Sequence, residues 1–140
     1  MVIDDFGSRS RGLAERARVS GPGLRTFANL AALWHLTDSQ QSRAVGAPCL
    51  EVYCEWVEAA RRYQDLILEM DVLMHISAIL GIYASLRTLY GPDVDVLDWL
   101  QRCNRGKLFD GRPPLERILG GDFEEQMQLR SYLAAICAGN

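Results

Sequence analysis

The 140-residue sequence lacks the residue spacings that mark most metal centres. It has four cysteines, none of them spaced as Cys-x-x-Cys, and its two histidines, His35 and His75, lie far from them in the chain. A tetrahedral zinc site usually draws on short paired spacings. We therefore expect no bound metal and interpret the four cysteines as buried free thiols.

The signatures of common enzyme families are also missing. The sequence contains no Gly-x-Gly-x-x-Gly, no phosphate-binding loop, no Gly-x-Ser-x-Gly and no His-Glu-x-x-His. A Cys54–His75 pair and a cation held by the acidic row Glu51, Glu55 and Glu58 stay open, but ordinary packing and a solvated helix face account for them more simply. We expect a protein that is not an enzyme and needs no cofactor.

Long apolar runs and strong positive charge are absent too. No segment approaches the ~20 apolar residues of a membrane span, and the N-terminus has no apolar core of a signal peptide. We expect a cytoplasmic protein with no membrane contact. The net charge is −3, whereas a dedicated nucleic-acid binder usually carries a basic stripe. Any DNA contact would have to rely on local charge or on a second protomer.

Hydrophobic residues make up 49% of the chain, so most of it should fold, and their spacing predicts an all-α protein. Residues 1–23 are rich in Gly, Ser and Arg and end in Gly-Pro-Gly, which predicts a flexible arm. Thr37 and Gln40 are in capping-box register, and Gly46 should end the helix that follows. We expect helices over residues 24–35, 38–45, 48–62, 65–90, 95–103, 113–119 and 122–138.

The first three of these helices have the proportions of a helix-turn-helix. Two acids on the third helix would repel the phosphate backbone, so the face is a poor one for tight DNA binding. A three-helix unit of this kind is also a common helical core with no DNA role. Candidate DNA-binding residues are Ser39, Gln40, Arg43, Glu51 and Tyr53.

The long helix expected over residues 65–90 is apolar on more than half of its circumference. Such a helix is either a central core helix or an interface helix. Because one small subdomain cannot cover this surface, we expect a homodimer formed mainly by residues 24–92. Gly91-Pro92 then marks the boundary to a smaller helical domain, residues 93–140.

Two groups of residues resemble the Xre/MbcA/ParS antitoxin family. The N-terminal group is Trp34-His35-Leu36-Thr37, Gln41, Val45-Gly46, Trp56 and Ile76–Ile82 with Leu86 and Tyr90. The C-terminal group is more specific: Trp99-Leu100, Asn104, Gly111, Pro113-Pro114-Leu115, Ile118-Leu119, Gly121 and Tyr132-Leu133. Cys103 departs from the family pattern, which usually has proline before this asparagine.

The resemblance implies an antitoxin of a type II toxin–antitoxin module that binds and inhibits a RES-domain, NAD-consuming toxin. It implies a helix-turn-helix-like dimerisation domain followed by a toxin-binding domain, with possible autoregulatory binding to operator DNA. A helix-turn-helix regulator without a toxin partner is the alternative. The expected toxin-binding residues are Asn104, Arg105, Lys107, Phe109, Arg112, Arg130, Tyr132, Ala134, Ile136, Gly139 and Asn140.

Overall fold

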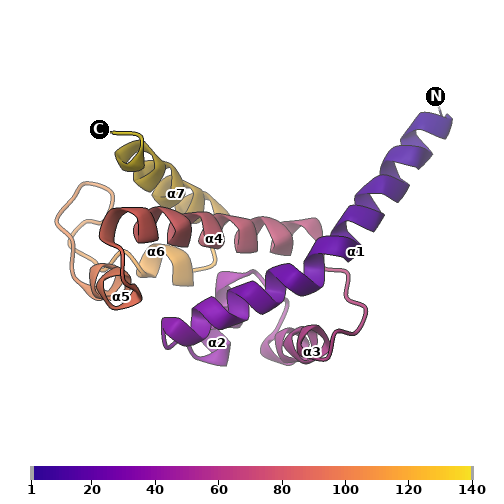
Figure 1. The fold of residues 1–140 in the computed structure, drawn as a ribbon, viewed down its shortest axis with the longest axis horizontal. Coiled ribbons are helices and arrows are strands. Elements are labelled where there is room, and N and C mark those ends of the chain that lie inside the picture. Colours follow the sequence, from indigo (N-terminus) through magenta and orange to yellow (C-terminus); the bar gives the residue numbers. More distant parts are fainter. Residues whose placement is uncertain (1, 140) are drawn as a thin grey trace.

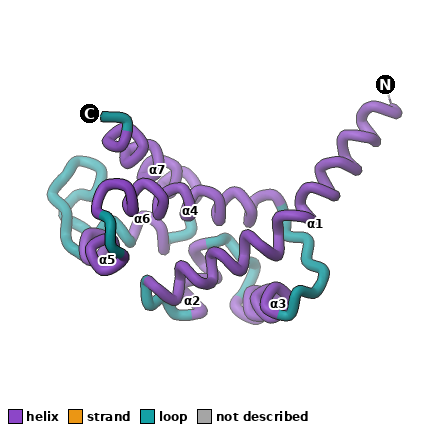
Figure 2. Tube along the Cα trace, in the orientation of Figure 1, coloured by secondary structure: helices purple, strands orange, loops and turns teal. Residues whose placement is uncertain are grey.

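The computed structural model describes the backbone of residues 2–139 and the side chains of residues 12–139. Within that range the fold is all-α, as predicted, with no strand (Figures 1 and 2). The helices are α1 Val2–Leu33, α2 Asp38–Ala44, α3 Leu50–Arg61, α4 Met70–Tyr90, α5 Asp93–Gln101, α6 Glu116–Leu119 and α7 Phe123–Cys137.

Helix α1 corrects the prediction of an arm over residues 1–23. The helix runs without interruption from Val2 to Leu33 and contains Pro22. It changes direction part-way along (Figure 1), and a proline in a helix commonly causes such a bend. The fully buried Ser20 fixes α1 to the body, because its Oγ accepts a hydrogen bond from the backbone nitrogen of Leu68 (2.9 Å). This tertiary contact stabilises helix where local composition predicts none.

Helix α2 follows the prediction closely. Thr37 caps it, with its side chain accepting from the backbone nitrogen of Gln40 while the Gln40 side chain accepts from that of Thr37. Gly46 follows the helix with φ of +72°, the left-handed conformation that glycine tolerates best. The capping box and the helix end are therefore confirmed.

Helical spacing predicts that α3 buries Val52, Trp56 and Ala59 or Ala60, and the observed buried face differs in part. Tyr53 is 1% exposed and Ala60 is buried, whereas Trp56 is only partly buried against the core. Helix α4 begins at Met70 and not at residue 65, because residues 64–69 form an extended connection. Leu68 within this connection is buried beside α1.

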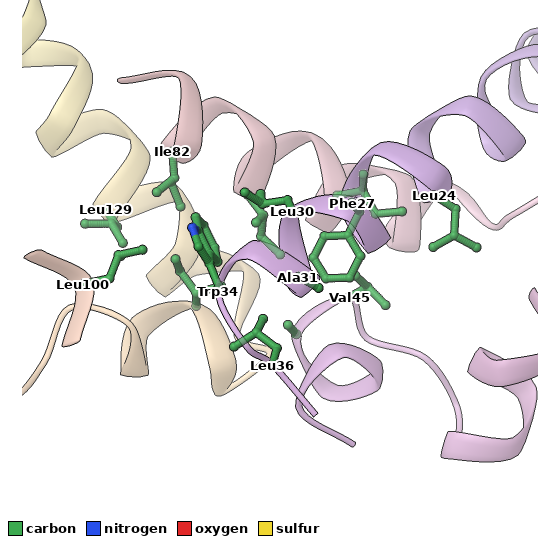
Figure 3. Close-up of a cluster of buried hydrophobic side chains, with 14 of the residues drawn as sticks. Leu24, Phe27, Leu30, Ala31, Trp34, Leu36, Val45, Ile82, Leu100 and Leu129 are labelled. Carbon is green, nitrogen blue, oxygen red and sulfur yellow. The ribbon is translucent and has the colours of Figure 1, made fainter. Parts of the chain in front are cut away.

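One hydrophobic core runs through both halves of the chain. Figure 3 shows Phe27, Leu30 and Trp34 of α1 facing the same interior as Ile82 of α4 and Leu129 of α7. The side-chain nitrogen of Gln126, on α7, donates to the backbone oxygens of Ala44 (2.8 Å) and Ile118 (3.0 Å). The C-terminal half is thus bonded directly to the end of α2.

Candidate functional site

The loop between α5 and α6 is held in shape by its own backbone. The Asn104 nitrogen donates to the Arg112 oxygen (3.2 Å), and the Gly111 nitrogen donates to the Asn104 oxygen (2.9 Å). The Asn104 side chain also accepts from the Gly106 nitrogen (2.8 Å), a local turn for which asparagine is well suited. Asn104 therefore organises the loop, in addition to its expected role in binding a partner.

The sequence suggests Leu108 and Phe109 as exposed anchors for a partner, with packing under the final helix as the alternative, and Phe109 takes the second role. It is only 3% exposed, and its ring lies edge-on to Trp99 (5.7 Å between centroids) and to Tyr132 (5.5 Å). Trp99 in turn stacks on Tyr90 of α4 (5.8 Å). Phe109 fastens the loop to the body and cannot contact a partner without leaving this row of rings.

The charged residues of the same loop face outward. Arg105, Lys107 and Arg112 are exposed, and only Arg112 has an acidic group near it, with Glu116 at 3.9 Å among the described ion pairs. Exposed arginine beside partly exposed apolar side chains is typical of the rim of a protein interface. Leu108 is half-buried and packs on the core. It thus lies between the two roles that the sequence allows for it, an anchor for a partner and a residue packed under the final helix.

The last helix places the other expected residues along its length. Tyr132 is 40% exposed, Ala134 and Gly139 are exposed, and Ile136 is half-buried. The side chain of Arg130 lies directly over Gly81 of α4. A Cβ atom added to this glycine would lie only 2.9 Å from the Arg130 Cζ. Asn140 lies outside the described residues.

The candidate DNA-binding residues do not form one exposed face. Tyr53 is buried, and its hydroxyl donates to the Gln41 side chain (2.7 Å); burial raises its pKa well above the ordinary 10.0. The expectation that Tyr53 reads DNA is therefore wrong. The Gln40 side chain is engaged in the cap of α2. Ser39, Arg43 and Glu51 are exposed as expected.

The cysteines also differ from the prediction. All four are free thiols, but Cys49, Cys54 and Cys103 are exposed and Cys137 is half-buried. Between residues 12 and 139, no group of three or more His, Cys, Asp or Glu side chains comes together in a way that could hold a metal ion. Among the described residues Cys54 and His75 form no hydrogen bond, because both ring nitrogens of His75 lie beside backbone oxygens, one of Asp71 and one of Gly121.

Two polar residues join the halves of the molecule: His75, which the sequence suggested only as a partner of Cys54, and Gln126, which the sequence did not single out. The ring nitrogens of His75 lie 2.7 Å from the Asp71 oxygen and 3.1 Å from the Gly121 oxygen, and the ring meets Phe123 edge-on. Gln126 is fully buried and bridges two backbone oxygens. Gln126 is a polar residue among apolar ones on the last helix, and this could have marked it as a buried polar residue. Its partner Ala44 could not be predicted, because it lies 82 positions away in the sequence.

Comparison with known proteins finds a relative that is similar to this chain over most of its length. No protein-family model matches it, and no solved structure is significantly similar. "Uncharacterized protein y4oB" of Sinorhizobium fredii (strain NBRC 101917 / NGR234) is 30% identical over 122 residues, which cover 87% of this chain and 88% of the relative. Since the likeness spans nearly the full length of both proteins, the chain belongs to the same family as y4oB.

Proposed function

We propose that the chain is the antitoxin of a type II toxin–antitoxin module and that it binds and inhibits a RES-domain, NAD-consuming toxin. One observation carries the proposal: the order and spacing of the C-terminal motifs that resemble the Xre/MbcA/ParS family. These positions also lie in one packed unit, in which the Leu115 nitrogen donates to the Leu100 oxygen (3.0 Å). Trp99 packs beside the Phe109 of the loop.

The surface available to a toxin combines the charged loop with the outer face of α7. The Phe109–Tyr132 contact brings these two elements together. Arg105 and Lys107 supply exposed positive charge, and the half-exposed Tyr132 supplies an aromatic group of the kind enriched in interface hot spots. The mixture suits a partner with an acidic rim around an apolar recess.

The end of α7 is our candidate for the element that blocks the toxin's NAD cleft. A chain terminus can enter a cleft that a folded face cannot. Ala134, Ile136 and Gly139 lie on the last turns, beyond the fully buried Leu133 that anchors the helix. Arg130 and Tyr132 would lie at the mouth of the cleft.

Co-expression with the RES-domain product of a neighbouring gene tests the proposal. The full chain should restore growth and co-purify with the toxin. A chain lacking residues 134–140 keeps Leu133 and should stay folded by circular dichroism, yet lose protection. The charge reversals Arg105→Glu and Lys107→Glu should weaken binding by at least about tenfold together, as rim charges at an interface can.

Arg61→Glu is the matched control, because Arg61 is also an exposed arginine but lies on α3, at the other end of the molecule from the loop (Figure 1). It should protect cells as well as the unmodified chain does. If the truncated chain protects fully, the blocking element is the loop and not the terminus. Failure of the full chain to protect or to bind the toxin refutes the proposed function.

Autoregulatory DNA binding is the weaker part of the proposal. Ser39 and Arg43 remain exposed on α2, but Glu51 stands in the first turn of α3 and the whole chain is acidic. Footprinting of the chain's own promoter, with and without toxin, decides this part. If the chain protects the promoter DNA and has no toxin partner, the regulator alternative is favoured. If the DNA is protected neither with nor without toxin, the chain has no DNA-binding role.

A further inference from the structure

An apolar groove lies where α1 and α4 diverge. Its walls are Glu15, Arg16, Val19 and Gly23 of α1 and Met70, Leu73, Met74, Ile76, Ser77 and Leu80 of α4. Met70 is 50% exposed and Met74 is 42% exposed. Contiguous apolar surface of this kind, rimmed by charged residues, marks a site of interaction.

Helix α4 has more apolar surface than the other helices of one copy cover. Contrary to the expectation from the sequence, this helix has the length and hydropathy of a membrane-spanning helix, a property that it shares with core helices. Only 33% of its most apolar 18-residue stretch is buried. Helix α7 packs on it, and the α1 segment nearest Leu24 packs on it too. The face toward the groove is the part that these helices leave open.

The N-terminal part of α1 extends beyond the α1 residues that pack in the core, which begin at Leu24. Figure 1 shows it projecting away from the body. Leu13 on this part is 49% exposed, and in the sequence Ile3, Phe6, Leu13 and Ala17 follow the alternating three- and four-residue spacing of a helix–helix seam, with Ser10 between them. Most of the stability of such a helix should come from packing against a partner.

We propose that two copies of this chain exchange these helices, the projecting half of α1 from each copy lying antiparallel in the α1–α4 groove of the other. Because α1 forms one wall of the groove, a helix that enters it also lies beside the partner's α1. The contact is therefore reciprocal and closes about a two-fold axis. This inference concerns the dimer alone and does not rest on the proposed function.

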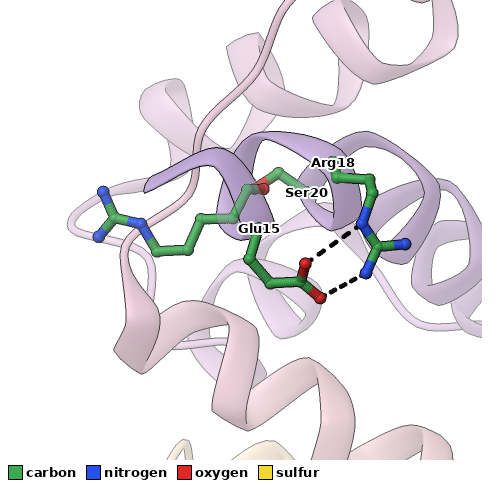
Figure 4. A network of polar contacts seen from close by, with 4 residues as sticks. Glu15, Arg18 and Ser20 are labelled. Carbon is green, nitrogen blue, oxygen red and sulfur yellow. Dashed lines mark hydrogen bonds and ion pairs between the residues drawn. The ribbon is translucent and has the colours of Figure 1, made fainter. Parts of the chain in front are cut away.

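Charge supports the antiparallel direction. Asp4 and Asp5 lie near the start of α1, and Arg9, Arg11, Arg16 and Arg18 follow. Antiparallel pairing brings the two acids of each copy toward Arg16 and Arg18 of the other, with Arg9 and Arg11 between them, whereas parallel pairing would bring the acids of the two copies together. Arg18 already pairs with Glu15 (Figure 4). Arg16 is only loosely paired with Glu69 (3.6 Å), and its Nε is buried without a hydrogen-bond partner. A carboxylate from a second copy would complete its bonding.

The size of the contact suits a weak dimer. Half of the 32-residue α1 is about 24 Å long and, with its side chains, about 10 Å wide. Two such contacts, each burying surface on both copies, bury roughly 1,000 Å², the lower bound for a specific interface. The exchanged helices therefore supply most of the area that such an interface needs.

Light scattering on the full chain tests the proposal. The unmodified protein should be a dimer at about 50 µM, a concentration at which a micromolar complex is largely formed. Leu13→Glu on the projecting helix and Met74→Glu in the groove should each raise the dissociation constant by more than about tenfold, since each places a charge in an apolar contact. Both positions are exposed, so the body of each variant should stay folded, and circular dichroism should show at most the loss of the projecting part of α1.

The control is Val94→Glu, which places the same charge at an apolar residue that is 73% exposed and outside the groove. It should leave the dimer intact. A direct measurement uses two populations with the native cysteines replaced by serine, one carrying Ile3→Cys and the other Met74→Cys. Helix exchange predicts a disulfide between the two populations when they are mixed.

Three results would overturn the proposal. One is a monomer at 50 µM, and a second is a dimer that all three glutamate variants leave unchanged. The third is a monomer that binds phosphatidylglycerol vesicles through Met74, which would show that the groove takes lipid and not a second copy. Toxin neutralisation can fail or succeed independently of each.

Discussion

Gly121, in the turn between α6 and α7, allows a direct measurement of how closely the two halves of the chain pack. Its φ is +78°, and an added Cβ would overlap the backbone oxygen of Arg43 and lie 3.3 Å from its carbonyl carbon. Gly111, in the loop, has the same φ of +78° but no atom within 4 Å of the added Cβ. Alanine at Gly111 therefore reports backbone strain alone, and alanine at Gly121 reports strain together with the clash.

The expected losses differ in size. The left-handed conformation costs a non-glycine residue about 1–2 kcal/mol, so Gly111→Ala should lower the free energy of unfolding by that amount. At Gly121 the obstacle is backbone, which cannot rotate away, and overpacking adds about 1–3 kcal/mol. Gly121→Ala should therefore cost about 2–5 kcal/mol, which lowers Tm by roughly 3 °C per kcal/mol in a chain of this size.

Urea denaturation, monitored by circular dichroism, measures the free energy of unfolding of both variants under the same conditions. Equal losses for the two variants would refute the close approach of α2 to the turn before α7. A larger loss at Gly111 than at Gly121 would show that the loop carries more backbone strain than its φ indicates.

Further predictions follow from the buried aromatic residues. Phe109→Ala should cost about 3–5 kcal/mol by leaving a cavity under the loop, whereas Tyr132→Ala should cost less because Tyr132 is 40% exposed; urea denaturation compares them. Tyr53→Phe should cost about 1 kcal/mol at neutral pH through loss of the hydrogen bond to Gln41. Burial raises the pKa of Tyr53 above 10.0, so its contribution to stability is complete below pH 10 and falls as the pH rises above it, because the unfolded chain ionises first. Denaturation on either side of pH 10 should show a steeper fall for the unmodified chain than for Tyr53→Phe.

Elements governed by local rules could be predicted from the sequence. The capping box at Thr37, the left-handed Gly46 and the cap at Asp122, whose side chain accepts from two backbone nitrogens of the first turn of α7, all depend on residues within a few positions of one another. The all-α class depends on helical spacing summed over many residues. These signals need no knowledge of distant contacts.

The errors arose where distant contacts decide. Residues 2–23 read as an arm because of their Gly, Ser and Pro content, but Ser20 is fixed by the backbone of Leu68, 48 positions away. Tyr53 looked like a surface residue, but Gln41 accepts a hydrogen bond from its hydroxyl, which permits burial. Phe109 looked like an exposed anchor because its neighbours Trp99 and Tyr132 lie on different helices.

The row of rings Tyr90, Trp99, Phe109 and Tyr132 also gives the molecule a natural optical probe. The other two tryptophans lie elsewhere, Trp34 fully buried against Tyr83 and Trp56 on α3. Trp99 is half-buried and touches the loop through Phe109, so a shift of the loop would change the polarity around its indole. With Trp34 and Trp56 replaced by phenylalanine, emission from Trp99 would follow events at the loop in real time, with no dye attached.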